Sequence, residues 1–439
     1  MNITVPEKVN EVLSVLNGAG YEAYTVGGCV RDSCLGRTPH DWDITTSATP
    51  LQVRELFRRT VDTGIRHGTI TVLLGEEAFE VTTYRIDGIY QDGRHPSGVT
   101  FTRSLAEDLR RRDFTINAMA YHPMEGMVDL FGGLEDLKNG LIRAVGTPED
   151  RFREDALRIM RAVRFSAQLN YRIETETRKA IRICAPDLKK ISAERIRDEL
   201  EKLLVSDHPG YIREAVRLGL TAVFLPELDE CMEATQHNSH HIYTVGEHII
   251  RSVEAVGNDR ILRLTMLFHD LAKPECRTLI GAEEKFPGHP EKSAVLCGKI
   301  MRRLKFDNDS IRKVQTLVRC HGIIPGKTPA EVRRQIVMVG EELFPLLFEV
   351  KLADAAAQKE GRLTYRQEEV RDWKKLYEEI LHSGDCLSLK QLAVTGEDLI
   401  GAGIRPGRKL GELLEQMLED VLETPSHNTR AYLMETYVR

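Results

Sequence analysis

Two aspartates stand one residue apart in the segment PHDWDITT, residues 39–46. On a β-strand alternate side chains lie on the same face, so Asp41, Asp43 and Thr45 would share one face of a strand here. Two carboxylates on one open face repel each other unless a cation lies between them. We therefore interpret the pair as ligands of a divalent metal ion. The alternative is a solvated edge strand.

A glycine pair and an arginine lie upstream, in the segment VGGCVRDS. Gly27 and Gly28 let the backbone approach a ligand closely, and they precede a predicted helix whose free N–H groups favour an anion. Arg31 adds a cation. No G-x-x-x-x-G-K-[ST] loop occurs, which excludes a P-loop protein. A phosphate cradle beside two carboxylates suits a two-metal in-line displacement at phosphorus, with one metal activating the attacking hydroxyl and the other neutralising the leaving pyrophosphate.

A third carboxylate is expected from an adjacent strand. In AFEVTTYR, Glu80 and Thr82 share one face of the predicted strand. We take Glu80 as the candidate, against the alternative of a surface acid.

The elements that position these residues alternate over about the first 140 residues. Strands are predicted at YTV and DWDITT, and a hairpin at GTITVLLG and AFEVTTYR. Helices are predicted at CVRDSCLG and ATPLQVRELFRR, the second capped by Thr49 with Pro50 at its first position. From about residue 141 the pattern is almost entirely helical. The sequence thus predicts an α+β head, with a mixed sheet and helices, followed by a long all-α body.

Composition is that of a globular chain of three or four modules, with 439 residues, 41% hydrophobic and 29% charged. No apolar run approaches a membrane span, and the N-terminus lacks a signal-peptide pattern. The eight cysteines form no C-x-x-C motif, so we expect a protein of the reducing cytoplasm. The net charge of −6 argues against a general nucleic-acid binder. Residues 151–202 nevertheless carry 14 Lys/Arg against 9 Asp/Glu, which fits either a local phosphate-binding surface or a solvated helix face.

Three motifs in order carry a family resemblance: VGGCVRDSCLGRTPHDWDI, EDLRRRDFTINAMAY and RFREDALRIMRAVRF. They resemble the leading motifs of class II tRNA nucleotidyltransferases and of their bacterial poly(A) polymerase relatives, closely over about the first 200 residues. The resemblance implies a polymerase-beta-like nucleotidyltransferase head in which Asp41 and Asp43 hold magnesium. It places Gly28 and Arg31 at the nucleotide and Arg112 at the nucleotide's ribose.

The third motif predicts a helix with a polar row that could read a base. Asp155, Arg158, Arg161 and Arg164 are spaced by three, so the row drifts by only about 60° per step. Cytosine and adenine present an amine donor beside a ring-nitrogen acceptor, whereas uracil and guanine present the reverse. An aspartate beside an arginine matches the first pair, and such complementarity is worth about 1–3 kcal/mol. The alternative is a surface ion pair with solvated arginines.

The family resemblance assigns base reading to Asp155 and Arg158. It places Arg161 and Arg164 beside them, towards the nucleotide's phosphates or the wall of the site. Enzymes of this family that add only CC lack part of the connector DGIYQDGRHP, residues 87–96, which here looks full length. This favours an enzyme that adds the terminal A, as a complete CCA adder or as a dedicated A-adder. Poly(A) polymerases share the three motifs and stay open as an alternative.

A histidine–aspartate constellation lies in the helical body, in the order VGEHIIRSV, LFHDLAKP, FPGHPEKSA, VRCHGI and VKLADAAAQ. This order resembles the HD metal-dependent phosphohydrolase superfamily. The residues that match its ligands are His248, His269, Asp270 and Asp354, with His289 and His321 at extra positions of some two-metal members. Imidazole with carboxylate suits manganese, nickel, iron or zinc. In related enzymes the module has phosphatase or 2′,3′-cyclic phosphodiesterase activity, or is degenerate. We expect metal binding here and leave catalysis open.

The tail GAGIRPGRKLGELL combines a glycine-rich turn with a helix predicted to begin near Arg408. Gly403, Arg405 and Gly407 could present backbone amides and charge to an RNA phosphate, or the turn could serve packing only. The resemblance implies that the tail grips the acceptor–TΨC arm of tRNA.

We expect five segments: a head at 1–140, a base-recognising neck at 141–205, a connector at 206–235, an HD domain at 236–360 and a tRNA-binding tail at 361–439. The leading hypothesis is template-independent, magnesium-dependent addition or repair of the 3′-CCA end of tRNA from CTP and ATP. The alternatives are a poly(A) polymerase or A-adding enzyme, and an HD phosphohydrolase whose head only binds RNA.

Overall fold

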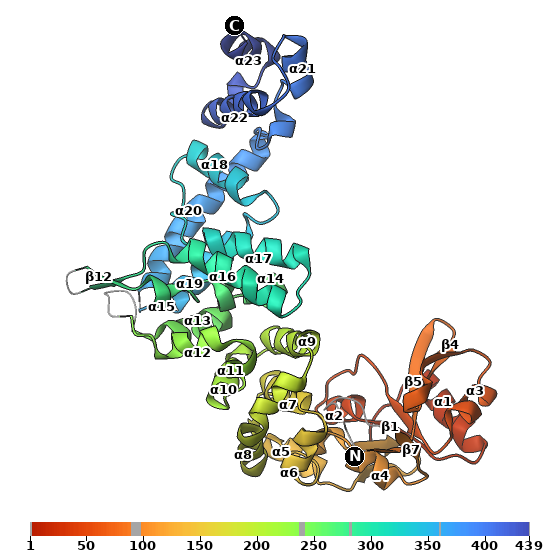
Figure 1. Ribbon diagram of the computed structural model, residues 1–439. Helices are drawn as coiled ribbons and strands as arrows, with labels where there is room; N and C mark the ends of the chain where they lie inside the picture. Colours follow the sequence, from red (N-terminus) through yellow and green to blue (C-terminus); the bar gives the residue numbers. More distant parts are fainter. Residues whose placement is uncertain (1, 89–97, 237–241, 281–282, 360, 439) are drawn as a thin grey trace. The chain divides into compact units, whose positions relative to one another are not determined.

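Two compact units make up the chain, Met1–Pro226 and Glu227–Arg439. The computed structural model describes residues 2–88, 98–236, 242–280, 283–359 and 361–438 (Figure 1). Residues 87 and 88, at the beginning of the predicted connector, are described. The rest of the connector, residues 89–96, lies outside the described residues. The predicted fold class is confirmed: a mixed sheet with helices comes first, and a helical body follows.

A seven-stranded sheet forms the centre of the head, in the order β3-β4-β5-β2-β1-β8-β9. Within this sheet β2 and β5 pair in parallel, and the other neighbouring strands pair antiparallel. The predicted hairpin is confirmed as β4 and β5. The strands are β1 (Ala23–Val26), β2 (Ile44–Thr46), β3 (Thr60–Gly64), β4 (Thr69–Leu74), β5 (Glu77–Thr83), β8 (Met119–His122) and β9 (Gly126–Asp129), with a separate pair β6 (Arg85–Asp87) and β7 (Val99–Phe101).

The helices of the head are α1 (Glu7–Gly18), α2 (Gly28–Cys34), α3 (Pro50–Leu56), α4 (Leu105–Arg110) and α5 (Gly133–Asn139). The predicted start of α3 is confirmed. The Thr49 hydroxyl accepts a hydrogen bond from the Gln52 amide, and the Gln52 side chain accepts one from the Thr49 amide, which forms a capping box. The helix ends at Leu56, earlier than the predicted segment.

The strand predicted over DWDITT is shorter than expected. It begins at Ile44, so Asp41 and Asp43 lie in the irregular segment just before β2. The carbonyl of Asp43 still accepts a hydrogen bond from the Val26 amide at 3.0 Å, which ties this segment to the end of β1. The aspartate pair is therefore anchored at the edge where β1 ends and β2 begins.

The single helix predicted through EDALRIMRAVRF is also wrong. It is two helices, α6 (Pro148–Glu154) and α7 (Leu157–Leu169), with Asp155 between them in an extended conformation (φ −140°, ψ 103°). The Asp155 carboxylate accepts a hydrogen bond from the Leu157 amide at 3.0 Å. An aspartate that bonds the backbone two residues on favours a turn over a continuous helix, which explains the break.

Helix α7 is the centre of the neck. Most of its residues are buried, including Arg158 and Arg164. Strand β10 (Leu141–Ile142) precedes α6 and pairs with β11 (Arg172–Ile173), which follows α7. The helices after β11 in this part of the chain are α8 (Thr175–Cys184), α9 (Ala193–Leu204), α10 (Ile212–Arg217) and α11 (Thr221–Phe224).

In the described residues of the second unit, the regular structure is helical except for one short hairpin, β12 (Thr278–Ile280) with β13 (Glu283–Lys285). An aromatic cluster lies in its core, where Phe344 and Phe348 each pack against Trp373 at ring-centroid distances of 5.1 Å. The predicted tail helix begins at Arg408, as expected. The helices are α12 (Pro226–Glu233), α13 (Val245–Ala255), α14 (Arg260–Phe268), α15 (Lys273–Cys276), α16 (His289–Arg303), α17 (Asn308–Cys320), α18 (Pro329–Val339), α19 (Leu346–Ala356), α20 (Arg362–Ser383), α21 (Gly396–Gly401), α22 (Arg408–Glu423) and α23 (Arg430–Tyr437).

Within the described part of the chain, none of the helices combines the length and the apolar character needed to cross a membrane.

Gly133 allows a test of the packing of α5 against the segment that contains Thr115 and Met119. A Cβ at this position would press into the Thr115 carbonyl oxygen and lie 2.7 Å from Met119 Cγ. We expect Gly133→Ala to lower the free energy of unfolding by about 1–3 kcal/mol. The midpoint of thermal unfolding would fall by about 2–10 °C in calorimetry.

Gly18→Ala is the matched control, because no atom lies within 4 Å of the position of its added Cβ. It should leave the midpoint unchanged or raise it slightly, since alanine favours a helix over glycine. Equal midpoints for the two variants would contradict the packing argument.

Candidate active site and candidate metal centre

The turn between β1 and α2 requires glycine at its first position. Gly27 has φ +79°, and a Cβ there would lie 2.9 Å from Nη1 of Arg112. The backbone of Gly27, in the predicted phosphate cradle, is thus in close contact with the guanidinium of Arg112, in the second motif. The structure brings these two predicted site residues together, and only a residue without a side chain permits it.

The aspartate pair lies beside this turn. Although Asp43 is open to solvent, crowding by protein atoms raises the pKa of its carboxyl. The charge of Arg112 opposes the rise, and the charge of Asp41 adds to it. A bound cation would relieve the repulsion between the two carboxylates, and oxygen donors alone suit magnesium. The donor set therefore fits the divalent metal that the resemblance implies.

Glu80 lies on β5 next to the aspartate segment. Because β2 and β5 are parallel and Ile44 pairs with Val81, continuing this register by one residue beyond β2 would bring Glu80 opposite Asp43. Its side chain is exposed. Among the described residues, groups of three or more metal-binding side chains within 4.8 Å of one another occur in the second unit, and Asp41, Asp43 and Glu80 do not form one. The register supports Glu80 as the third carboxylate, which stays a prediction.

A buried carboxylate, Asp108, holds the arginines of the second motif. Its oxygens lie 2.8 Å from Nη2 of Arg111 and 3.7 Å from Nη2 of Arg112, and it accepts a hydrogen bond from the Thr45 hydroxyl at 3.0 Å. Burial works to raise the pKa of Asp108, but the charges of Arg111 and Arg112 outweigh it and lower that pKa. Asp108 therefore stays ionised and orients Arg112.

A second buried carboxylate, Asp113, connects the head to the neck. It accepts a hydrogen bond from Nε of Arg161 at 2.7 Å and from Nδ2 of Asn117 at 3.1 Å. The Asn117 oxygen in turn accepts a hydrogen bond from Nη1 of Arg31 at 2.7 Å. Burial works against ionisation, yet Arg161 and Asn117 lower the pKa of Asp113 to about 2. The predicted residues Arg31 and Arg161 are thus joined through two residues that were not predicted.

The predicted base readers have different partners. The Asp155 carboxylate lies 2.9 Å from Nη2 of Arg195, on α9. Nη1 of Arg158 donates to Glu154 at 2.6 Å and to the Arg151 carbonyl at 3.0 Å. Both side chains are therefore held by neighbours.

The sequence analysis missed several residues that hold the predicted ones: Asp108, Asp113, Asn117, Glu154, Arg195 and Glu199, the last of which lies 2.6 Å from Nε of Arg164. Asp108 and Glu154 could have been predicted from the sequence, because each lies three or four residues before an arginine with which it forms an ion pair. Arg195 and Glu199 could not, because they are far from their partners in sequence.

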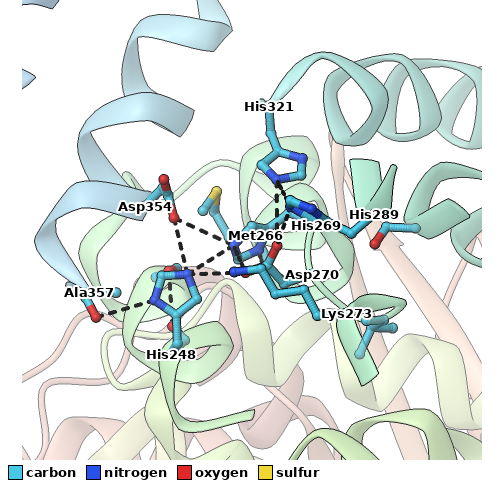
Figure 2. A network of polar contacts seen from close by, with 12 residues as sticks. His248, Met266, His269, Asp270, Lys273, His289, His321, Asp354 and Ala357 are labelled. Carbon is cyan, nitrogen blue, oxygen red and sulfur yellow. Dashed lines mark hydrogen bonds and ion pairs between the residues drawn. The ribbon is translucent and has the colours of Figure 1, made fainter. Parts of the chain in front are cut away.

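All six predicted ligands of the second unit come together in one buried centre, which Figure 2 shows. One side chain in it, Asp270, faces two groups. One of its oxygens, Oδ2, lies 3.3 Å from Nε2 of His248 and 3.2 Å from Nε2 of His269. The other oxygen, Oδ1, lies 3.3 Å from Nε2 of His289 and 3.5 Å from Nε2 of His321.

The two groups have separate members. His248, His269 and Asp354 form one set of candidate ligands, and Asp270, His289 and His321 form the other. Asp270 belongs to the second set, and its Oδ2 also faces the two histidines of the first.

Hydrogen bonds fix the orientation of all four imidazoles. Each Nδ1 lies within hydrogen-bond distance of a backbone carbonyl, and these pairs are His248–Ala357 at 3.2 Å, His269–Met266 at 2.8 Å, His289–Phe286 at 2.7 Å and His321–Val318 at 2.7 Å. Because a carbonyl only accepts, each Nδ1 carries a proton, and each ring in its neutral form points the lone pair of Nε2 at the centre. Metal-binding histidines are commonly held in this way.

The centre therefore collects acceptors that need a cation. The Nε2 atoms of His248 and His269 are 3.2 Å apart, and those of His289 and His321 are 3.3 Å apart. Neither oxygen of Asp270 accepts a hydrogen bond from the described residues, although the Lys273 ammonium lies 2.6 Å from Oδ2.

In the absence of metal, a proton can serve as the cation. Burial disfavours a charged His248, but the neighbouring carboxylates of Asp270 and Asp354 prevail and raise the pKa of this histidine to about 9.

Three family models match parts of the chain. The family described as Poly A polymerase head domain matches residues 23–143. The family described as Probable RNA and SrmB-binding site of polymerase A matches residues 170–232. The family described as tRNA nucleotidyltransferase domain 2 putative matches residues 292–437.

Similar proteins cover nearly the whole chain. The CCA-adding enzyme of Lactobacillus helveticus is 37% identical over 96% of this chain and 94% of its own. The CCA-adding enzyme of Enterococcus faecalis is 36% identical over 98% of this chain and 96% of its own. The structure of the Bacillus stearothermophilus CCA-adding enzyme in complex with CTP superimposes with a TM-score of 0.70 at 29% identity, covering 98% of both chains.

The fold and the site of the first unit define a nucleotidyltransferase. With relatives of this similarity over nearly its full length, the chain belongs to the family of CCA-adding enzymes.

Proposed function

We propose that this protein builds or repairs the 3′-terminal CCA of tRNA without a template, using CTP and ATP and releasing pyrophosphate. The observation that carries the proposal is the match to CCA-adding enzymes along 96% of the chain, together with the aspartate pair beside the Gly27 turn. All eight cysteines are free thiols, which suits the reducing cytoplasm where we place the protein.

The head would carry the chemistry. Asp41 and Asp43, with Glu80 as the third carboxylate, would hold magnesium. When bound, magnesium supplies charge neutralisation at the leaving pyrophosphate and activates the attacking hydroxyl. Gly28 and Arg31 would position the nucleotide at the start of α2, and Arg112, oriented by Asp108, would contact its ribose.

The neck would choose the base. The Asp155 carboxylate has more lone pairs than its contact with Arg195 uses, so it can also accept the exocyclic amine of cytosine or adenine. Arg158, held by Glu154, would donate to the neighbouring ring nitrogen. Arg161 and Arg164 would face the phosphates or the wall of the site.

The tail would bind the acceptor–TΨC arm of tRNA. Gly403 and Gly407 have positive φ angles of 92° and 144°, and the exposed Arg405 lies between them, just before α22. Backbone amides and a cation at a helix start suit an RNA phosphate. The alternatives of a dedicated A-adder and a poly(A) polymerase have less support, because the relatives that match the full chain are CCA-adding enzymes.

The first prediction tests the aspartate pair. Asp43→Asn and Asp41→Asn keep the side-chain shape but remove the charge that holds a metal. Each should lower nucleotide addition by at least about 1,000-fold, a loss of about 4 kcal/mol of transition-state stabilisation. Affinity for tRNA, measured by filter binding, should stay within about threefold because the tail contributes it.

Asp62→Asn is a suitable control, since Asp62 is an exposed carboxylate on β3 in the same sheet. Near-normal turnover by Asp41→Asn or Asp43→Asn would overturn the metal assignment.

The second prediction tests the base reader. Asp155→Ala removes the acceptor for the exocyclic amine, so the ratio of CTP to UTP incorporation should fall about ten- to a hundredfold. Total incorporation should fall less than this ratio, because the aspartate pair is intact. Asp150→Ala, an exposed carboxylate on α6, serves as the control. An unchanged preference for CTP in the Asp155 variant would show that another group reads the base.

We further propose that the centre around Asp270 binds two transition-metal ions, such as manganese, nickel, iron or zinc, and hydrolyses phosphate esters. The observation in favour is the convergence of four Nε2 atoms with the buried carboxylate of Asp270 and the partly buried carboxylate of Asp354. The donor set of imidazole and carboxylate fits these metals. A bound pair of ions supplies a hydroxide nucleophile at neutral pH. Lys273, which is buried beside Asp270, would add a positive charge for the anionic substrate.

The third prediction tests this centre. His289→Ala removes one ligand of the second set at a partly exposed position. Metal analysis should show about two ions per chain in the wild type and about one in the variant. Hydrolysis of bis(p-nitrophenyl) phosphate and p-nitrophenyl phosphate should be lost in the variant. Addition of CTP to tRNA should be unchanged, because that site lies in the first unit.

His382→Ala, an exposed histidine on α20, is the control for loss of a surface histidine. Wild-type protein without metal would contradict the metal centre. Bound metal without hydrolysis of either ester would contradict the proposed activity.

A further inference from the structure

Three guanidinium groups surround one aromatic ring in the first unit. Phe165, near the end of α7, is only 4% exposed. The Cζ atom of Arg164 lies 4.0 Å from its ring centroid, that of Arg31 lies 5.1 Å away and that of Arg161 lies 5.3 Å away. An aromatic face attracts a cation within about 6 Å of its centroid, most strongly where water is excluded. Phe165 was not among the residues that the sequence analysis singled out.

Each of the three guanidinium groups also has a polar partner. Nη2 of Arg161 lies 2.6 Å from Asp113, and Nε of Arg164 lies 2.6 Å from Glu199. Arg31 contacts Asn117 and Asp32. These partners fix an edge of each group, and the ring of Phe165 supplies a common apolar surface for all three.

The ring is the place where the three sequence motifs meet. Arg31 comes from α2 in the first motif, whereas Arg161 and Arg164 come from α7 in the third. Phe114, in the second motif, packs edge-to-face against Phe165 at a centroid distance of 5.8 Å. A single side chain therefore contacts the cradle of the head, the segment that supplies Arg112, and the neck.

Three cations this close together repel one another. The carboxylates Asp113 and Glu199 offset part of the repulsion, and the negative face of the ring offsets a further part of it. Burial lowers the pKa of Arg164, and the charge of Glu199 opposes this. Keeping the guanidinium of Arg164 charged in its buried position therefore costs free energy. Removing the ring's negative face should therefore let the cations separate.

We propose that Phe165 is a positioning residue for nucleotide binding, whose ring holds Arg31, Arg161 and Arg164 in one array that receives the triphosphate. The proposal rests on the assignment of these arginines to the nucleotide made above. The ring acts on charges that every nucleoside triphosphate shares. Affinity for CTP and for ATP should depend on it equally, and the choice of base, assigned to Asp155 and Arg158, should not.

The experiment replaces Phe165 by phenylalanines carrying one, two or three fluorine atoms on the ring. Fluorination weakens the negative face while the ring keeps nearly the same volume, so packing is preserved and a folding failure is avoided. Calorimetry gives the Kd for CTP and for ATP with magnesium and without tRNA, and steady-state kinetics gives KM and kcat separately.

We expect both Kd values to rise stepwise with each fluorine, reaching about tenfold for the trifluorinated ring, equivalent to about 1.4 kcal/mol. The value of kcat should stay within about twofold, and the ratio of CTP to UTP incorporation should not change. Phe165→Leu should give a rise at least as large.

Phe152→Leu, at another fully buried phenylalanine of the neck, controls for the loss of an aromatic ring from the core. It should lower the unfolding temperature without raising the Kd.

Kd values that do not respond to fluorination would overturn the role of the ring, whatever the outcome for CCA addition. A stepwise rise in Kd in a protein that adds no CCA would support the positioning role and contradict the proposed function. Equal increases in Kd for Phe165→Leu and Phe152→Leu, with no response to fluorine, would reduce Phe165 to core packing.

Discussion

Buried carboxylates hold the arginines of the first unit in place, and the rest of that site depends on this pairing. Asp108 orients Arg112, and Asp113 joins the second motif to Arg161 on α7. Because an unpaired buried charge costs several kcal/mol, each guanidinium is fixed by its partner before any substrate arrives. A cationic array that needs no rearrangement suits a polyanionic triphosphate, since the cost of ordering has already been met in folding.

The second unit contains the opposite arrangement. Around Asp270 carboxylates and the Nε2 atoms of four imidazoles converge, and the Nδ1 hydrogen bonds to backbone carbonyls keep each Nε2 turned inward. The first unit thus presents surplus positive charge to an anionic substrate, and the second presents surplus lone pairs to cations. The two centres lie in different compact units and share no ligand, so their chemistry can be separated by mutation.

Sequence patterns predicted which candidate site residues lie close together better than they predicted the secondary structure of those residues. The D-x-D pair could be recognised because its two charged residues lie close together in the sequence. The period-two pattern, however, predicted a strand over Asp41 and Asp43, which lie before the first residue of β2. The spacing of Asp155 with the arginines predicted one continuous helix. The hydrogen bond that the Asp155 carboxylate accepts from the Leu157 amide instead favours a break between two helices. The histidines of the second unit were found because each lies in its own motif. Contacts such as that of Arg195 with Asp155, or Arg31 with Phe165, join residues distant in sequence, so no local spacing could predict them.

The most direct test of the central claim is to incubate the purified protein with tRNA that lacks its CCA end and to sequence the products. CTP alone should give two added cytidines, and CTP with ATP should give CCA and no further extension. UTP and GTP should be poor substrates. Addition of a single adenosine only to tRNA that already ends in CC would identify a dedicated A-adding enzyme. Long adenosine tracts on unrelated RNA would identify a poly(A) polymerase, and either result would contradict the account.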